Sequence, residues 1–150
     1  MANPPKRKGD HAELEVASQL RSLTGWPVTR KLGAGRREDT GDLAGIPDCT
    51  AQVKNYRDIT RAIREAVPEL EAQHANGATT FAVAFIRRPG GRFIAVQTLE
   101  QWATSHREAV GLCAVALCGR PASAVRPDRK GIARPVCTEH ARIMGGMSLP

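Results

Sequence analysis

The two segments that decide the fold are Gly41-Asp42-Leu43 and Asp48-Cys49-Thr50-Ala51-Gln52-Val53-Lys54. Apolar and polar residues alternate in the second segment, and this alternation predicts a strand that runs from Asp48 to Asn55. Asp42 opens a shorter strand over residues 42–44, which is followed by a turn at residues 45–47. We therefore expect an acidic residue on one strand to lie beside a Gln-x-Lys sequence on the next. The longer strand has a core face and a polar face, which carry Cys49, Ala51 and Val53, and Asp48, Thr50, Gln52 and Lys54, respectively.

A helix from Gly9 to Leu23 and a strand over residues 26–30 are predicted before these segments. On a helical wheel, Glu13 falls in the middle of the apolar face of this helix, whereas Glu15 points toward solvent. An acid on a core-facing stripe is costly unless it pairs with a cation or binds a metal ion. Glu13 is therefore a candidate functional residue, and Glu15 is expected to be an ordinary surface charge.

The remaining elements of the core follow the Gln-x-Lys strand. Asp58 is expected to cap a helix from Ile59 to about Ala75, and residues 79–97 are expected to form a hairpin of two strands. A short helix from Thr98 should follow, with Leu99 and Trp102 facing inward. The order α-β-β-β-α-β-β-α predicts an α/β fold in which helices flank a mixed sheet.

Composition limits the classes of protein and of partner. The chain has 150 residues, a net charge of +7 and a pI near 9.8, which favours a polyanionic partner such as nucleic acid over a charge that serves solubility alone. No apolar run reaches the ~20 residues of a membrane span, and no signal peptide is evident, so we expect a cytoplasmic protein. We predict a disordered basic arm over residues 1–8, a core over 9–108 and a separate tail over 109–150.

The ordered set of motifs resembles the PD-(D/E)xK nuclease superfamily, and within it the archaeal-type and phage Holliday-junction resolvases. The resemblance covers roughly residues 6–104 and implies a restriction-endonuclease-like core. Its motifs are Lys8-Gly9-x-x-x-Glu13, Gly33-Ala34-Gly35, Gly41-Asp42-Leu43, Gln52-Val53-Lys54-Asn55, and the hairpin Phe81-Ala82-Val83-Ala84-Phe85 with Gly91-Arg92-Phe93-Ile94-Ala95-Val96.

The resemblance implies an endonuclease that uses Mg²⁺ or Mn²⁺. Glu13, Asp42 and the carbonyl group of Val53 would hold the metal, and Lys54 would stabilise the attacking water or the charge that develops on phosphorus. Gln52 occupies the position of the family's second carboxylate ligand and carries no charge. Asp48 is the predicted source of the missing charge, because it shares the polar face with Gln52 and Lys54.

The implied substrate is branched or duplex DNA, cut by a homodimer whose two active sites match a four-way junction. If the protein is phage-encoded, its compartment is the host cytoplasm. Two alternatives stay open: a restriction- or recombination-type nuclease that cuts other DNA, and a non-enzymatic DNA-binding protein on a degenerate nuclease fold. A simple surface ion pair between Asp42 and Lys54 is a third, purely structural interpretation. The residues expected to contact DNA phosphates are Lys6, Arg7, Lys8, Arg30, Lys31, Arg36 and Arg37.

The tail contains the pattern Cys113-x₄-Cys118-x₁₈-Cys137-x₂-His140, which is typical of a zinc knuckle with Cys₃His coordination. The segment resembles small treble-clef-like zinc modules. About forty residues with few apolar side chains bury too little surface to fold alone, so we expect a structural Zn²⁺ to stabilise them. The alternative is three buried cysteines with a histidine nearby by chance.

Overall fold

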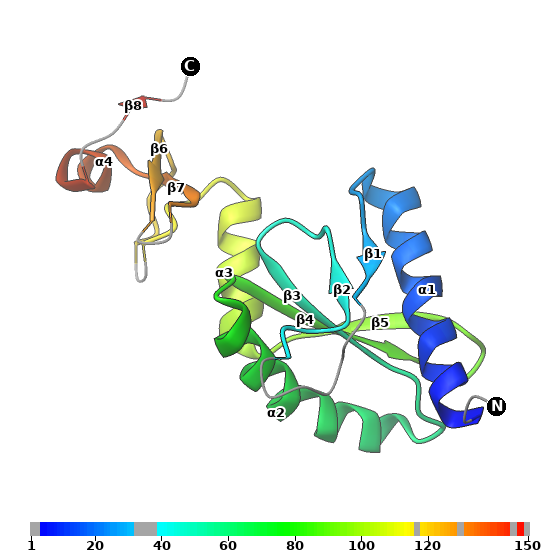
Figure 1. The fold of residues 1–150 in the computed structure, drawn as a ribbon. Helices are drawn as coiled ribbons and strands as arrows, with labels where there is room; N and C mark the ends of the chain where they lie inside the picture. The colour runs from blue at the N-terminus through cyan, green and yellow to red at the C-terminus, as the bar shows by residue number, and fades with distance from the viewer. Residues whose placement is uncertain (1–3, 32–38, 116–117, 129–130, 145–146, 149–150) are drawn as a thin grey trace. The chain divides into compact units, whose positions relative to one another are not determined.

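The computed structural model describes residues 4–31, 39–115, 118–128, 131–144 and 147–148 (Figure 1). The chain forms two compact units, Met1–Gln101 and Trp102–Pro150. The division falls within helix α3 (Leu99–Ala109), close to the boundary predicted between residues 108 and 109. No helix in the described part of the chain combines the length and the apolar character that crossing a membrane requires.

The first unit contains a mixed five-stranded sheet, which confirms the predicted α/β fold. The strands lie side by side in chain order, and only β3 and β4 are parallel. Their parallel pairing requires a crossover, which helix α2 (Ile59–Gly77) supplies. The strands are β1 (Thr29–Arg30), β2 (Leu43–Ala44), β3 (Cys49–Lys54), β4 (Phe81–Arg87) and β5 (Phe93–Val96).

The two long helices have different starting signals. Asp58 caps α2 as predicted, because its carboxylate accepts hydrogen bonds from the N–H groups of Thr60 (2.9 Å) and Arg61 (3.1 Å). Helix α1 spans Pro4–Thr24 and begins earlier than expected, so residues 4–8 are helical and the predicted disordered arm is wrong for them. Prolines suit a first helical turn, since their fixed φ is helical and the missing N–H has no partner there.

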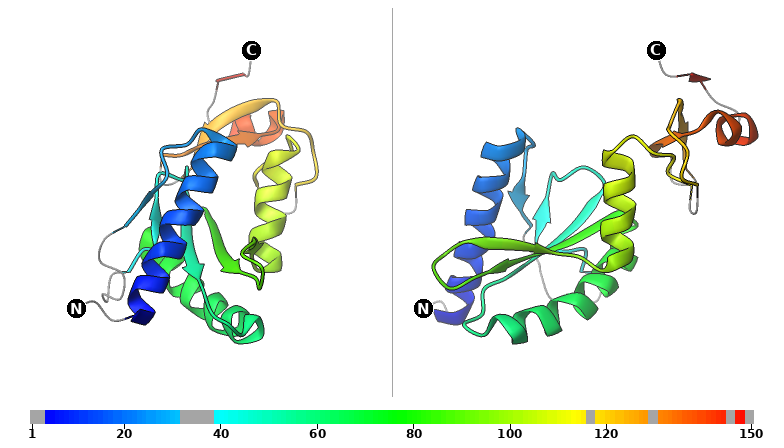
Figure 2. Two further views of the ribbon diagram at one scale, coloured as in Figure 1. Left: turned by 90° about the vertical axis from the view of Figure 1, so that its right-hand side faces the viewer. Right: turned by 180° about the vertical axis from the view of Figure 1, so that it is seen from behind.

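The sheet has a different core on each face (Figure 2). Helix α1 packs on one face, where the apolar side of β3 contributes Ala51 and Val53. Helix α2 packs on the other face, and much of that interface consists of alanines, which let the helix lie close to the strands. The predicted face assignment of β3 is therefore confirmed, but its polar face is covered by α2 and Gln52 is only 2% exposed. The alanines of this interface are Ala62, Ala66, Ala82 and Ala84.

Helix α3 is anchored by hydrogen bonds at its start and not by its apolar side chains. Gln101 Oε1 accepts a hydrogen bond from the N–H of Ala82 (3.0 Å), and Thr98 Oγ1 accepts one from the N–H of Gln101 (3.2 Å). The expectation that Leu99 and Trp102 face inward is wrong, since they are 74% and 53% exposed. The hydrogen bond from Ala82 to Gln101 therefore fixes the start of α3 on β4.

The second unit is a small module built around a three-stranded sheet of order β7-β6-β8. Among its described residues, five form a buried apolar cluster, and two of these are cysteines. Arg126 is buried and donates two hydrogen bonds to the carbonyl group of Ala141 (3.0 and 2.8 Å). The elements are β6 (Ala124–Pro127), β7 (Ala133–Val136), α4 (Thr138–Met144) and β8 (Met147–Ser148).

Candidate functional site

Asp42 is held at the edge of β3 by its backbone and by its side chain. Its N–H donates to the carbonyl group of Ala51 (2.8 Å), and its Oδ2 accepts from the N–H of Val53 (2.7 Å). Gly41 has φ +94°, and a Cβ there would lie 2.6 Å from the carbonyl oxygen of Ala51, so only glycine permits this close approach. Val53 lies between Gln52 and Lys54 in the sequence, so the hydrogen bond from its N–H places the Asp42 carboxylate beside the backbone of these two residues.

The environment of Asp42 disfavours its charged form. The side chain is buried, and its pKa is raised from the ordinary 3.8 to about 6, chiefly by this burial. The negative charges of Glu13 and Asp39 contribute to the rise, whereas the Val53 N–H and Lys54 oppose it. A buried carboxylate of this kind gains stability from a nearby cation, and a divalent ion would supply the largest such charge.

Glu69 of α2 provides the negative charge that Gln52 lacks. Gln52 Nε2 donates a hydrogen bond to Glu69 Oε2 (2.6 Å), and Lys54 Nζ forms an ion pair with the same oxygen. The crossover helix therefore delivers a carboxylate to the buried polar face of β3. Glu69 was not predicted from the sequence, although the neutral side chain of Gln52 favours an acid on the helix that covers this strand.

The amide oxygen of Gln52 has no hydrogen-bond donor among the described residues. A carboxylate can only accept, so the contact with Glu69 fixes which end of the amide carries the NH₂ group. Oε1 is then buried and, among the described residues, receives no hydrogen bond. Leaving a buried acceptor unsatisfied costs about 1–3 kcal/mol. A hydrogen-bond donor or a cation at Oε1 would remove this cost, and an amide oxygen is one of the oxygen ligands that Mg²⁺ accepts.

Asp48 does not compensate for Gln52, which corrects the sequence analysis. It lies at the opposite end of β3 from Lys54, where its Oδ1 accepts a hydrogen bond from the N–H of Thr80 (3.0 Å). Its φ of +47° shows that the chain turns here before the strand begins. Sharing a strand face does not imply contact, because each residue along a strand adds about 3.3 Å.

Glu13 has a structural partner that the sequence analysis did not foresee. Its carboxylate pairs with Arg30 of β1, which also pairs with Asp10. The helical wheel predicted correctly that Glu13 is buried, since its side chain is 13% exposed. The ion pair with Arg30 compensates for this burial, so a metal ion is not needed to explain it. Glu15 is not an ordinary surface charge either, because it forms an ion pair with Arg87 (2.7 Å).

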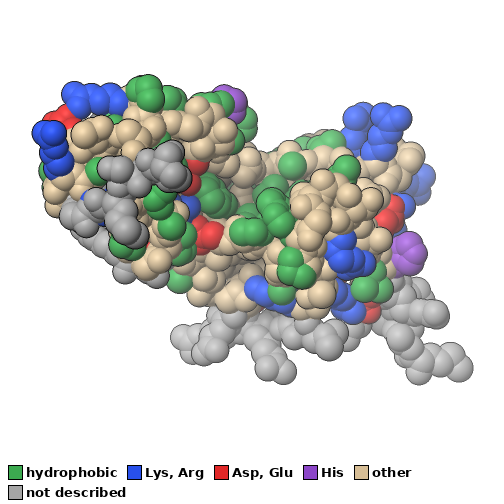
Figure 3. All heavy atoms as spheres, turned by 90° about the horizontal axis from the view of Figure 1, so that it is seen from above, with side chains coloured by type: hydrophobic (Ala, Val, Ile, Leu, Met, Phe, Trp, Pro, Cys, Tyr) green, Lys and Arg blue, Asp and Glu red, His purple; other side chains and the backbone are tan. Residues whose placement is uncertain are grey.

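The residues predicted to contact DNA differ in how available they are. Arg30 is committed to two carboxylates, and Lys31 Nζ donates to the carbonyl group and hydroxyl of Thr40 (3.0 and 2.9 Å). Lys8 is exposed. Lysine and arginine side chains occur in separate groups on the face drawn in Figure 3. The structure does not describe Arg36 and Arg37 or the side chains of Lys6 and Arg7.

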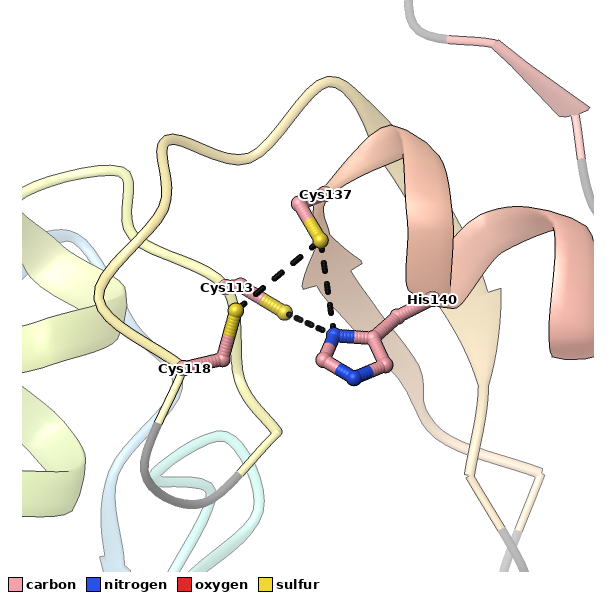
Figure 4. Close-up of side chains that lie close together, drawn as sticks. All are labelled: Cys113, Cys118, Cys137 and His140. Atoms are coloured by element: carbon pink, nitrogen blue, oxygen red, sulfur yellow. Dashed lines mark hydrogen bonds between the residues drawn. The ribbon is translucent and has the colours of Figure 1, made fainter.

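The second unit brings the four predicted zinc ligands together (Figure 4). Their ligand atoms all lie within 4.8 Å of one another. His140 Nδ1 is 3.3 Å from Cys113 Sγ and 3.4 Å from Cys137 Sγ, and the Sγ atoms of Cys118 and Cys137 are 3.9 Å apart. A tetrahedral zinc site with the usual bond lengths has edges of roughly 3.5–3.8 Å, so this Cys₃His cluster could hold Zn²⁺.

Local structure prepares this cluster for metal binding. The backbone N–H of His140 lowers the pKa of Cys137 to about 7, which favours the thiolate that metals require. All four cysteines of the chain are free thiols, and Cys49 lies apart in β3.

Compared with known proteins, the chain matches no protein family, no curated protein and no solved structure.

Proposed function

We propose that the protein is a Mg²⁺- or Mn²⁺-dependent endonuclease that hydrolyses phosphodiester bonds in branched or duplex DNA, with the four-way Holliday junction as its preferred substrate. The observation that carries this proposal is the unsatisfied Oε1 of Gln52 on β3, the strand whose Val53 N–H binds the Asp42 carboxylate and whose Lys54 pairs with Glu69 of α2. This combination is costly for stability and is chemically suited to a hard cation and a phosphate group.

Each residue has a distinct part in the proposed chemistry. Asp42 and Gln52 would hold the metal ion through oxygen atoms, and Glu69 would fix the amide of Gln52 and contribute the second negative charge. Bound Mg²⁺ would lower the pKa of a coordinated water and offset charge on the phosphate. Lys54, which Glu69 holds in place, would face the charge that develops on phosphorus.

The zinc cluster has a separate role in this proposal. We infer that Zn²⁺ at Cys113, Cys118, Cys137 and His140 is structural, because four protein ligands leave no open position for catalysis. A homodimer is proposed because resolving a junction requires two cuts at a fixed spacing. The net charge of +7 favours DNA as the partner.

The decisive experiment is a cleavage assay on a four-way junction, a linear duplex and a flap, each with Mg²⁺, with Mn²⁺ and with EDTA. We expect metal-dependent cutting, fastest on the junction. Binding to these substrates without cutting in either metal would favour the degenerate-nuclease alternative, which the pairing of Glu13 with Arg30 makes worth testing. Cutting of duplex alone would favour a restriction-type nuclease.

Glu69 provides a specific test of the assigned site. Glu69→Gln should lower the cleavage rate by about tenfold or more, since it removes the only carboxylate that contacts both Gln52 and Lys54 among the described residues. Glu71→Gln is the matched control, because Glu71 is an exposed acid on the same helix. The measurement is the single-turnover rate as a function of Mg²⁺ concentration.

A second substitution shows whether Glu69 acts through its charge. Gln52→Glu should restore much of the activity of Glu69→Gln, because it returns one negative charge to the same place. The four proteins of this double-mutant cycle should give strongly non-additive rates. Additive effects on the cleavage rate, or equal losses of activity in Glu69→Gln and Glu71→Gln, would show that Glu69 is not part of the site.

A further inference from the structure

A pocket of about 290 Å³ is lined by the three residues that follow Lys54, and the proposed chemistry does not use it. It lies where the parallel strands β3 and β4 end, which is the edge of an α/β sheet at which ligands usually bind. Asn55, the first residue after Lys54, forms part of its wall. The wall also includes Lys8, Arg57, Arg88, Gly90 and Gly91.

The pocket is built from three segments that are distant in the sequence. Asn55 Nδ2 donates a hydrogen bond to the carbonyl group of Lys8 (3.2 Å), which joins the end of β3 to helix α1. The β4–β5 hairpin reaches the same end of α1 (Figures 1 and 2). Its turn is closed by hydrogen bonds between Arg88 and Arg92 (2.7 Å) and between Gly91 and Arg88 (3.1 Å), so the backbone that carries Arg88 is fixed.

The charge of the pocket is strongly positive. Four of its lining residues are Lys8, Arg57, Arg87 and Arg88, and none of its lining residues is acidic. Arg87 is held by Glu15 and lies over the ring of Phe93, 5.5 Å from its centroid. Lys8, Arg57 and Arg88 are exposed and form no ion pair with any acid in the described part of the chain. Such a group of cations around a concave surface is suited to an anion with several oxygen atoms.

We propose that this pocket binds a phosphate group of a nucleic-acid backbone, next to the phosphate that lies at Lys54. The inference rests on the proposed function, because it takes the bound strand to be the strand that is cut. Arg57 and Arg88 make the new contacts, and the arginine fork suits two phosphate oxygens. Lys8 was expected to contact DNA from a disordered arm, but here it contributes from the first turns of α1.

The test measures binding without cleavage. Fluorescence anisotropy of a labelled four-way junction and a labelled duplex in EDTA, titrated with NaCl, gives the salt dependence of the association constant. Arg57→Gln/Arg88→Gln should lower the slope of log K against log [NaCl] by about one, since the slope counts phosphate contacts and both arginines hold the same phosphate group. Affinity should fall about tenfold or more at 0.15 M NaCl.

The control has the same change of charge elsewhere on the surface. Arg64→Gln/Arg142→Gln removes two exposed arginines that do not line the pocket, and it should leave the slope nearly unchanged. Equal slopes for the two double variants would overturn the proposal. So would binding of inorganic phosphate at Arg57 and Arg88, followed by NMR, with an unchanged slope for DNA, since the pocket would then take a free anion.

The outcome is separable from that of the proposed function. If the protein fails to cut in Mg²⁺ and Mn²⁺ but the slope falls by about one in Arg57→Gln/Arg88→Gln, the pocket binds a phosphate and the protein is not a nuclease. A protein that cuts junctions with an unchanged slope in that variant has the nuclease without the pocket.

Discussion

Replacing Asp42 by asparagine is expected to abolish cleavage and, at the same time, to stabilise the metal-free protein. Asparagine removes the negative charge that would hold the metal ion, so the cleavage rate should fall by about a hundredfold or more. Its amide oxygen can still accept the hydrogen bond from Val53, which preserves the local structure. A residue that lowers stability while enabling catalysis is a common signature of an active site.

The stabilisation should depend on pH in a defined direction. The pKa of Asp42 is about 6 in the folded protein and near 3.8 when unfolded, so the folded state binds the proton more tightly. Proton binding at Asp42 makes its full contribution to the free energy of unfolding below pH 3.8, and this contribution is lost as the pH rises through about 6. The loss is about 2–3 kcal/mol above pH 7, and Asp42→Asn avoids it.

Thermal unfolding in EDTA between pH 4 and 8 measures this effect. The difference in Tm between Asp42→Asn and the wild type should grow across this range, and adding Mg²⁺ at pH 8 should raise the Tm of the wild type alone. Asp58→Asn is the control, since asparagine caps a helix as well as aspartate does. A pH-independent difference, or equal stabilisation of both proteins by Mg²⁺, would contradict the assignment of Asp42 as a metal ligand.

Removing zinc should unfold the second unit and leave the first unit folded. In the described part of Trp102–Pro150 the buried cluster has five members, three of them valine or alanine, which is too little apolar surface for independent stability. Structural zinc contributes on the order of 10 kcal/mol in modules of this size. We expect one Zn²⁺ per chain by elemental analysis, and selective loss of dispersed amide signals from residues 102–150 after chelation.

The cysteines allow a matched comparison. Cys113→Ser should lose zinc and the signals of the second unit, whereas Cys49→Ser should keep both, because Cys49 lies in β3. Zinc-free protein with unchanged amide signals would show that the cysteines are core residues and that the histidine is close by chance.

Local patterns in the sequence predicted the structural features that depend on residues close together in the chain. The alternation in β3 and the cap at Asp58 are of this kind, and both are observed. Glu69 was missed because it reaches Gln52 only through the crossover of α2, which no spacing between the two residues encodes. Arg30 reaches Glu13 because β1 lies against α1. A helical wheel describes one helix only, so it predicted that Glu13 is buried but not that Arg30 is its partner.

The alanine interface between α2 and the sheet has a consequence for local motion. Methyl groups lose no rotamer freedom on folding, but they also bury little area, so few kilocalories hold the helix on the strands. Local opening is therefore expected to begin at α2, while β3 and β4 stay paired. Amide hydrogen exchange should be faster in α2 than in β4, and each opening would separate Glu69 from Gln52 and Lys54 and disassemble the site without unfolding the sheet.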